Sequence, residues 1–155
     1  GKEWFDLEGA LDEILGLLDR DLRRKGIRLS VSYSEPLPAL YARRKEIQLL
    51  VLNLVTNAIR AINKLPRYRR QIRLGVRRAE GGVLVEVSDL GKGVPDELQD
   101  TLFDAFVTGS EDGFGMGLTL CRRIAESHGG RIWADFSNAN GTTVSFTLPV
   151  ENSTR

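Results

Sequence analysis

Apolar and polar residues alternate in several stretches of the chain, and this period of two is typical of strands with one buried face. These stretches are residues 27–33, 71–77, 83–89 and 142–148, and the mainly apolar residues 132–136 predict a further strand before the last of them. The glycine pair at 81–82 predicts a hairpin turn between the second and third stretches, and Asn140 with Gly141 predicts a turn between the last two strands. The sequence therefore predicts a sheet that contains antiparallel pairs.

The third of these stretches ends in a carboxylate at an inward position. Three valines at alternate positions from 83 to 87 share one face of the predicted strand, and Asp89 continues their parity. A charge taken out of water is costly unless hydrogen-bond donors meet it. Gly91 and Gly93 then allow the backbone to turn sharply and to approach a bound molecule. This pattern indicates the floor of a ligand site.

Apolar residues spaced three and four apart predict helices over residues 7–25, 44–63 and 118–128. Asp6 is placed to cap the first helix, and Gly26 is placed to end it. A short helix is expected to begin near Pro95.

The helix predicted over residues 44–63 also carries a polar stripe. Asn53, Asn57, Arg60 and Lys64 recur at helical spacing on a face separate from its apolar residues. On an arbitrary helix such a stripe usually faces solvent. Asparagine oxygens are also hard, neutral ligands for Mg²⁺, and arginine and lysine hold phosphate, so the stripe could form the wall of an anion and metal site.

Composition narrows the class of protein. The 155 residues, 41% of them apolar, are enough for one domain with a packed core. The net charge of +1 gives no reason to expect a nucleic acid or an anionic membrane as partner. The single cysteine excludes an internal disulfide, and no apolar run approaches the length of a membrane span. Met116 is the only methionine, so we expect a piece of a longer protein.

Residues 89–93, DLGKG, resemble the D-x-G-x-G box of the GHKL, or Bergerat, ATP-binding fold that sensor histidine kinases share with DNA gyrase, Hsp90 and MutL. Three further boxes of that family stand in the expected order, at residues 53–58, 103–106 and 113–118. The chain is most similar to the catalytic domains of oxygen-sensing, dicarboxylate-sensing and nitrogen-regulatory sensor kinases.

The resemblance implies an α/β (α+β) two-layer sandwich, a mixed β-sheet with helices on one face. We expect residues 1–155 to form one histidine-kinase catalytic and ATP-binding domain. Residues 1–5 would be a linker remnant and residues 150–155 a tail. The dimerisation domain that carries the phosphoacceptor would be absent.

The resemblance also implies the ligands, ATP and Mg²⁺, and the residues that hold them. Asp89 would accept the adenine amino group with support from Thr142, Asn57 would bind Mg²⁺, and Asn53 and Asn57 would be the catalytic pair of the N box. The remaining nucleotide-binding positions are Arg60, Lys64, Gly91, Gly93, Thr108, Gly113, Gly115, Met116, Gly117 and Leu118.

Four other residues bear on these expectations. The resemblance implies that residues 108–114 form a lid over the nucleotide. Where the family usually has proline, this chain has Ala105, so the exit angle of the lid is expected to be less firmly fixed, and where related kinases often have lysine in the lid it has Ser110, so a weaker γ-phosphate contact is expected. His128, the only histidine, stands at a predicted helix end and is interpreted as structural, and Cys121 lies on an apolar stripe and is interpreted as core.

The function implied is that of a two-component sensor histidine kinase, with transfer of the γ-phosphoryl group of Mg-ATP to a histidine on the dimerisation domain. The expected partners are ATP or ADP, that domain and a downstream response regulator, with no nucleic acid and no direct membrane contact, in the cytoplasm. One alternative is a GHKL-type ATPase, against which Asn53 argues, since those ATPases carry a glutamate there that activates water. Another is a degenerate nucleotide-binding module without transferase activity.

Overall fold

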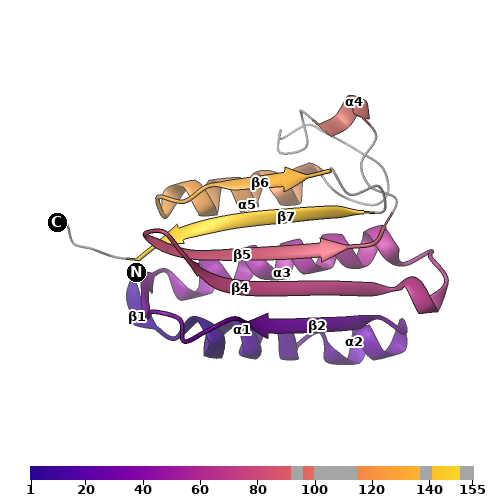
Figure 1. Ribbon diagram of the computed structural model, residues 1–155, viewed down its shortest axis with the longest axis horizontal. Coiled ribbons are helices and arrows are strands. Elements are labelled where there is room, and N and C mark those ends of the chain that lie inside the picture. Colours follow the sequence, from indigo (N-terminus) through magenta and orange to yellow (C-terminus); the bar gives the residue numbers. More distant parts are fainter. Residues whose placement is uncertain (92–95, 100–114, 137–140, 151–155) are drawn as a thin grey trace.

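The structure is a computed structural model that describes residues 1–91, 96–99, 115–136 and 141–150. Its main sheet has five strands in the order β2-β4-β5-β7-β6 (Figure 1). The strands are β2 (Arg28–Tyr33), β4 (Gln71–Ala79), β5 (Gly82–Asp89), β6 (Ile132–Asp135) and β7 (Thr142–Pro149). β2 and β4 are parallel and the other pairs are antiparallel, so the sheet is mixed as expected.

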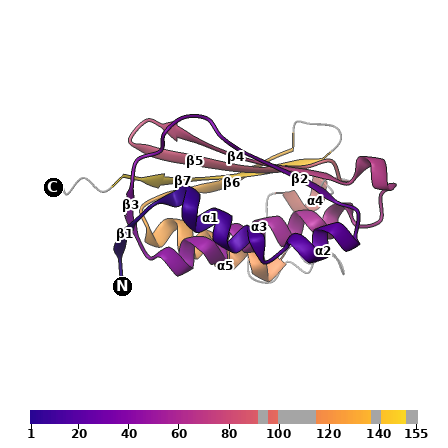
Figure 2. The ribbon, with the colours of Figure 1, turned by 90° about the horizontal axis from the view of Figure 1, so that it is seen from below.

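Helices cover one face of this sheet, and Figure 2 shows the two layers side by side. The helices are α1 (Leu7–Gly16), α2 (Asp19–Arg24), α3 (Arg44–Ile62) and α5 (Gly115–Ser127), with a short α4 (Asp96–Gln99) and a 3₁₀ turn over Arg67–Arg69. The two-layer α/β sandwich is thereby confirmed. Every helix within the described residues is too short or too polar to cross a bilayer.

The hydrophobic core lies between the layers. α3 contributes Ile47, Leu50 and Val51, each fully buried, and packs against both α1 and α5. Among the residues that the structure describes, Phe146 of β7 is the largest fully buried side chain. Removing this apolar surface from water is the main stabilising term of the fold.

The helix expected over residues 7–25 is interrupted. α1 ends at Gly16, and the N–H groups of Leu17 and Leu18 bond to the carbonyls of Ile14 and Leu15 in i to i−3 turns before α2 begins. Glycine is a poor helix former, and this tighter turn redirects the chain while the apolar period continues. Gly26, with φ of +66°, ends α2 as predicted.

A second, two-stranded sheet was not predicted. β1 (Glu3–Phe5) pairs antiparallel with β3 (Leu40–Ala42), so the part of the chain expected as a linker contains a strand. Phe5 is buried, and the rings of Trp4 and Tyr41 lie 5.3 Å apart. Three-residue strands are too short to show a period.

The start of the expected tail, residue 150, is held against the main sheet. The backbone N–H of Val150 bonds to the carbonyl of Gly81, in the turn between β4 and β5.

Two helix boundaries differ from expectation in ways that concern the site. α5 begins at Gly115, so Gly115 and Gly117 lie in its first turn and do not precede it. α3 ends at Ile62, so Lys64 lies in the turn after the helix and not on its stripe.

Candidate functional site

Asp89 is the last residue of β5, and its side chain is buried with 7% of its surface exposed. The backbone N–H of Gly91 donates to its Oδ1 at 2.7 Å, and the backbone N–H of Thr142 also donates to the carboxylate. Burial raises the pKa of Asp89 to about 6, because its effect outweighs these two hydrogen bonds, which lower it. The group is therefore ionised at neutral pH inside the protein.

This carboxylate has capacity for a ligand. An ionised carboxylate offers about four acceptor positions, and two amide donors leave some of them free. A further donor from a bound molecule would stabilise the buried charge, since a hydrogen bond to a charged group contributes about 1.5–3 kcal/mol. The predicted ligand floor at Asp89 agrees with this geometry.

Gly91 brings the end of β5 against the helix that carries the N box. A Cβ at position 91 would lie 2.8 Å from the carbonyl oxygen of Ala61 and 2.9 Å from Oδ1 of Asp89. Ala61 stands one helical turn after Asn57, so the close approach of the backbone at Gly91 brings the Asp89 carboxylate near the polar stripe of α3. A side chain at position 91 would separate these elements.

The start of β7 lies beside Asp89 and completes the ligand floor. Thr142 stands directly opposite Asp89 in the antiparallel ladder, so both side chains point to the helix-covered face, and Thr142 is buried. Gly141 has φ of +142°, and a Cβ there would lie 1.9 Å from the Asp89 carbonyl oxygen. On the open face of the sheet, the hydroxyls of Ser88 and Thr143 are 2.8 Å apart.

The side-chain amide of Asn57, in the N box on α3, is buried and only partly hydrogen-bonded. Asn57 is 5% exposed, its Oδ1 accepts a long 3.4 Å hydrogen bond from Arg60, and its Nδ2 has no hydrogen-bond partner. A buried polar atom without a partner costs about 1–3 kcal/mol, so this amide is poised for an external group. Asn53 is half-buried one turn earlier, and Arg60 and Lys64 are exposed.

These residues fit a magnesium ion that is held mainly by its nucleotide. No group of three or more acidic, histidine or cysteine side chains that could hold a metal exists among the residues the structure describes. Mg²⁺ in nucleotide sites commonly takes one or two protein oxygens together with phosphates and water. The amide of Asn57 can supply one such oxygen.

α5 begins beside this region with the glycine-rich sequence Gly115-Met116-Gly117. The first N–H groups of a helix have no partner within the helix and carry a partial positive charge, which favours phosphate. Leu118 is 1% exposed and anchors this first turn in the core. Cys121 lies one turn on, fully buried, and burial raises its pKa to about 12, which agrees with a core residue.

His128 lies at the opposite end of α5 and is structural. Arg43 donates its backbone N–H to Nε2 at 3.2 Å, so Nδ1 carries the proton and donates to the Ile124 carbonyl at 2.8 Å. His128 is buried, and both ring nitrogens are used. This histidine thereby ties the end of α5 to the start of α3, as its assignment to a structural role predicted.

Some predicted positions lie outside the described residues. These are Gly93, Thr108 and Gly113 of the nucleotide site, the Phe103 and Phe106 box, and Ala105 and Ser110. For Met116 the structure describes the helical backbone and not the side chain.

Sequence reasoning missed two residues that shape the floor. Ala61 is the surface on which Gly91 packs, and nothing distinguishes a small residue there from ordinary helix filling. Gly141 was expected as a turn residue beside Thr142, but its close approach to the Asp89 carbonyl was missed. Its position immediately before Thr142, which was predicted to bind the base, was the available signal.

Comparison with known proteins identifies the family. Residues 42–152 match the family described as "Histidine kinase-, DNA gyrase B-, and HSP90-like ATPase". The sensor histidine kinase TmoS of Ectopseudomonas mendocina is 33% identical over 148 residues, which are 94% of this chain and 15% of TmoS. The chain belongs to this family, and its relatives include sensor histidine kinases.

Solved structures agree with this assignment. The catalytic domain of histidine kinase ThkA superposes with a TM-score of 0.84 at 28% identity, over 97% of this chain and 96% of that domain. ThkA has also been solved in complex with the response regulator protein TrrA. Full-length ShkA in complex with AMPPNP gives a TM-score of 0.82 at 26% identity, over 97% of this chain and 31% of ShkA. The fold is thus that of a histidine kinase catalytic domain.

Proposed function

We propose that this chain is the catalytic, ATP-binding domain of a sensor histidine kinase. It binds Mg-ATP and transfers the γ-phosphoryl group to a histidine on the dimerisation domain of its parent protein. The observation that carries this proposal is the buried Asp89 carboxylate, which two backbone amides hold and which keeps free acceptor capacity beside α3.

In this proposal Asp89 accepts a hydrogen bond from the adenine amino group, and Thr142 supports the base from the facing strand. Gly91 lets the nucleotide pass close to the backbone, as we also expect of Gly93. A Cβ at position 91 would press on the Ala61 carbonyl and on Oδ1 of Asp89, and would so displace the carboxylate that accepts the base.

Phosphate is held between α3 and the start of α5. The amide oxygen of Asn57 would ligate Mg²⁺, which supplies charge neutralisation at the phosphates when bound. Arg60 and Lys64 are exposed cations that can reach the same anion, and the backbone N–H groups at positions 115–118 face it. Thr108 and Gly113 are expected to cover the phosphates. Phosphoryl transfer depends chiefly on such positioning and electrostatics.

Asn53 favours transfer over hydrolysis. An ATPase of this family would need a general base to activate water, and an amide is a poor base at any ordinary pH. Together Asn53 and Asn57 orient the metal and the phosphates without deprotonating a water molecule. The phosphoryl group is then left for a histidine that another domain presents.

Two solved relatives support the ligand and the downstream partner. ShkA was solved with AMPPNP, an ATP analogue, and ThkA with a response regulator. By analogy we propose that this chain binds ATP and ADP and that its parent passes the phosphoryl group to a response regulator. Because ATP is the donor, we place the domain in the cytoplasm.

Calorimetric titration with Mg-ADP and Mg-ATP tests whether the buried Asp89 carboxylate binds the nucleotide. Asp89→Asn keeps the shape of the side chain and replaces one acceptor oxygen by a donor, so both nucleotides should bind about 5- to 150-fold more weakly, from a loss of about 1–3 kcal/mol. Asp19→Asn, an exposed acid on α2, is the matched control and should bind as the parent does. Unchanged ADP affinity in Asp89→Asn would show that the floor is not the adenine site.

A further inference from the structure

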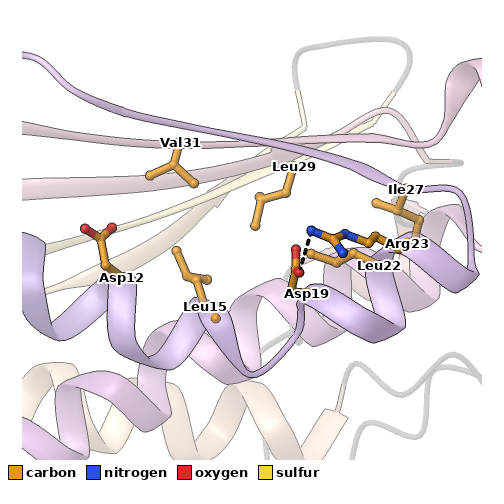
Figure 3. Close-up of a pocket in the computed structure, with 9 residues that line it drawn as sticks. Asp12, Leu15, Asp19, Leu22, Arg23, Ile27, Leu29 and Val31 are labelled. Atoms are coloured by element: carbon orange, nitrogen blue, oxygen red, sulfur yellow. Dashed lines mark ion pairs between the residues drawn. The ribbon is translucent and has the colours of Figure 1, made fainter.

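The outer edge of β2 carries a groove that nucleotide binding does not use. β2 is an edge strand, and α1 and α2 lie under it and reach past that edge (Figure 1). A cleft of about 570 Å³ opens between these elements. Its floor is apolar and its rim is charged (Figure 3), with Leu15, Leu22, Ile27, Leu29 and Val31 on the floor and Asp12, Asp19 and Arg23 at the rim.

The backbone of β2 turns unpaired hydrogen-bonding groups toward this open edge. Arg28 and Ser34 donate their N–H groups to carbonyls on the β4 side, at 2.9 and 3.0 Å. Successive residues of a strand point their backbone groups to opposite sides, so residues 29, 31 and 33 point theirs outward. Within the described chain no strand pairs with β2 on that side.

The edge also lacks the usual protection. Proteins normally blunt an edge strand with charges, proline or a bulge. Arg28, the first residue of β2, is the only charged residue of this strand, and residues 29–33 that follow it are Leu-Ser-Val-Ser-Tyr, without charge or proline. Val31 at their centre is 38% exposed. Leu17, in the break between α1 and α2, is 75% exposed. An unprotected edge beside exposed apolar side chains is the arrangement that recruits an additional strand.

The charges of the groove are unevenly distributed between its two ends. Asp19 is paired with Arg23 at 3.0 Å, whereas Asp12 accepts a hydrogen bond from the Tyr33 hydroxyl at 3.0 Å and forms no ion pair within the described residues. Glu8 stands one turn before Asp12 on α1 and is exposed. The Tyr33 end of the groove therefore carries net negative charge that a bound lysine or arginine could neutralise.

We propose that this groove binds an extended segment of a separate protein, which adds to the sheet as a sixth strand beside β2. The segment carries apolar side chains at alternate positions, which fill the floor between Leu15 and Val31, and a lysine or arginine beside Asp12. A second copy of the chain fits less well, because its own α1 and α2 reach past its β2 edge into the space that the first pair occupies (Figure 1). The charged rim also favours a separate partner, because complementary charges on two proteins speed their association and select against wrong partners.

The test uses a synthetic peptide of about nine residues in which valine and threonine alternate, with lysine at both ends. Its control has proline at the central position, which removes one backbone donor and breaks the strand. Titrated into the isotope-labelled chain, the first peptide should shift the amide signals of Leu29, Val31 and Tyr33. The proline peptide should bind at least about tenfold more weakly.

Variants of the chain separate backbone pairing from charge. Val31→Pro removes an outward donor and leaves the ladder to β4 intact, so it should weaken the peptide about tenfold. Ser30→Thr, on the opposite face, is the matched control and should bind normally. If Val31→Pro unfolds the domain, Asp12→Lys gives the second test, with an expected weakening of at least about fivefold that salt diminishes.

All folded variants should bind Mg-ADP as the parent does, which keeps this result independent of the nucleotide site. Absence of any amide shift at about 1 mM peptide would overturn the proposal, because even weak strand addition is populated there. Sedimentation that shows the chain dimerising without peptide, and remaining monomeric as Val31→Pro, would also overturn it by assigning the edge to a second copy.

Discussion

The Oδ1 oxygen of Asp89 accepts the backbone N–H of Gly91 at 2.7 Å, and this contact fixes the carboxylate at the end of β5. Asp89 is ionised above its pKa of about 6 and protonated below it. A protonated carboxyl has one acceptor fewer and carries no charge, so we expect it to hold an adenine amino group less well.

The first prediction is therefore that ADP affinity falls as the pH is lowered through about 6. At pH 5 only about a tenth of the carboxyl groups are ionised, so the Kd should rise about tenfold relative to pH 7.5. ADP itself titrates in this range, so the quantity to compare is the ratio of Kd values for the parent and Asp89→Asn. A ratio that stays constant from pH 5 to 8 would exclude Asp89 as the titrating contact.

The second prediction concerns Asn57. Asn57→Ala should abolish the gain in ATP affinity that Mg²⁺ provides, because the variant lacks the amide oxygen that we propose as a metal ligand. The free energy of unfolding should change by less than about 1 kcal/mol, since the substitution also removes the unpaired Nδ2 and alanine favours a helix. The measurement is an ATP titration at several Mg²⁺ concentrations.

Asn63→Ala, just past the end of α3, provides the control and should keep the full magnesium effect. If Asn57→Ala retains that effect as well, another group holds the metal.

Much of the fold could be predicted because long periodic stretches dominate it. The valines of β5 and the apolar face of α3 are buried as their periods indicated, and Asp89 lies at the inward end of its strand. The break at Gly16 and the pairing of β1 with β3 could not be predicted. Both depend on tertiary packing of a few residues, which leaves no period in the sequence.

The candidate site could be predicted as a set of sequence motifs, but the contacts between its elements could not. Asp89 was predicted from its inward position on a valine-rich strand, and Asn57 and Thr142 from motifs that resemble a known family. All three side chains are buried in the structure. The contact between Gly91 and Ala61 joins the end of β5 to α3, and neither residue carries a functional group from which the contact could be predicted.

A third prediction follows from that contact. Gly91→Ala would place a methyl group 2.8 Å from the Ala61 carbonyl and 2.9 Å from Oδ1 of Asp89, so the floor must move. We expect nucleotide affinity to fall at least about tenfold and stability to fall by about 1–3 kcal/mol, a typical cost of overpacking. Calorimetry and denaturant unfolding measure both.

Gly16→Ala is the matched control, because a Cβ there meets nothing within 4 Å and lies in a helix. It should leave affinity unchanged and raise stability by about 0.5–1 kcal/mol. A neutral Gly91→Ala would mean that β5 and α3 do not need this close approach.

The fourth prediction is that the isolated chain does not phosphorylate itself. His128 is buried with both ring nitrogens bonded, and it lies past the end of α5, about 20 Å from the glycine-rich start of that helix. Incubation with γ-labelled ATP should leave the chain unlabelled. Stable label that His128→Ala removes would show that this histidine is an acceptor and not a structural tie.

The most direct test of the whole account is transfer in trans. The chain is mixed with the dimerisation domain of its own parent kinase, supplied as a separate polypeptide, together with γ-labelled ATP and Mg²⁺. We expect label to appear on the histidine of that domain, slowly because the two parts are not tethered, and to be absent with Asp89→Asn or Asn57→Ala. No label on the dimerisation domain at saturating ATP, in a chain that still binds the nucleotide, would contradict the assignment as a histidine kinase catalytic domain and favour a binding module without transferase activity.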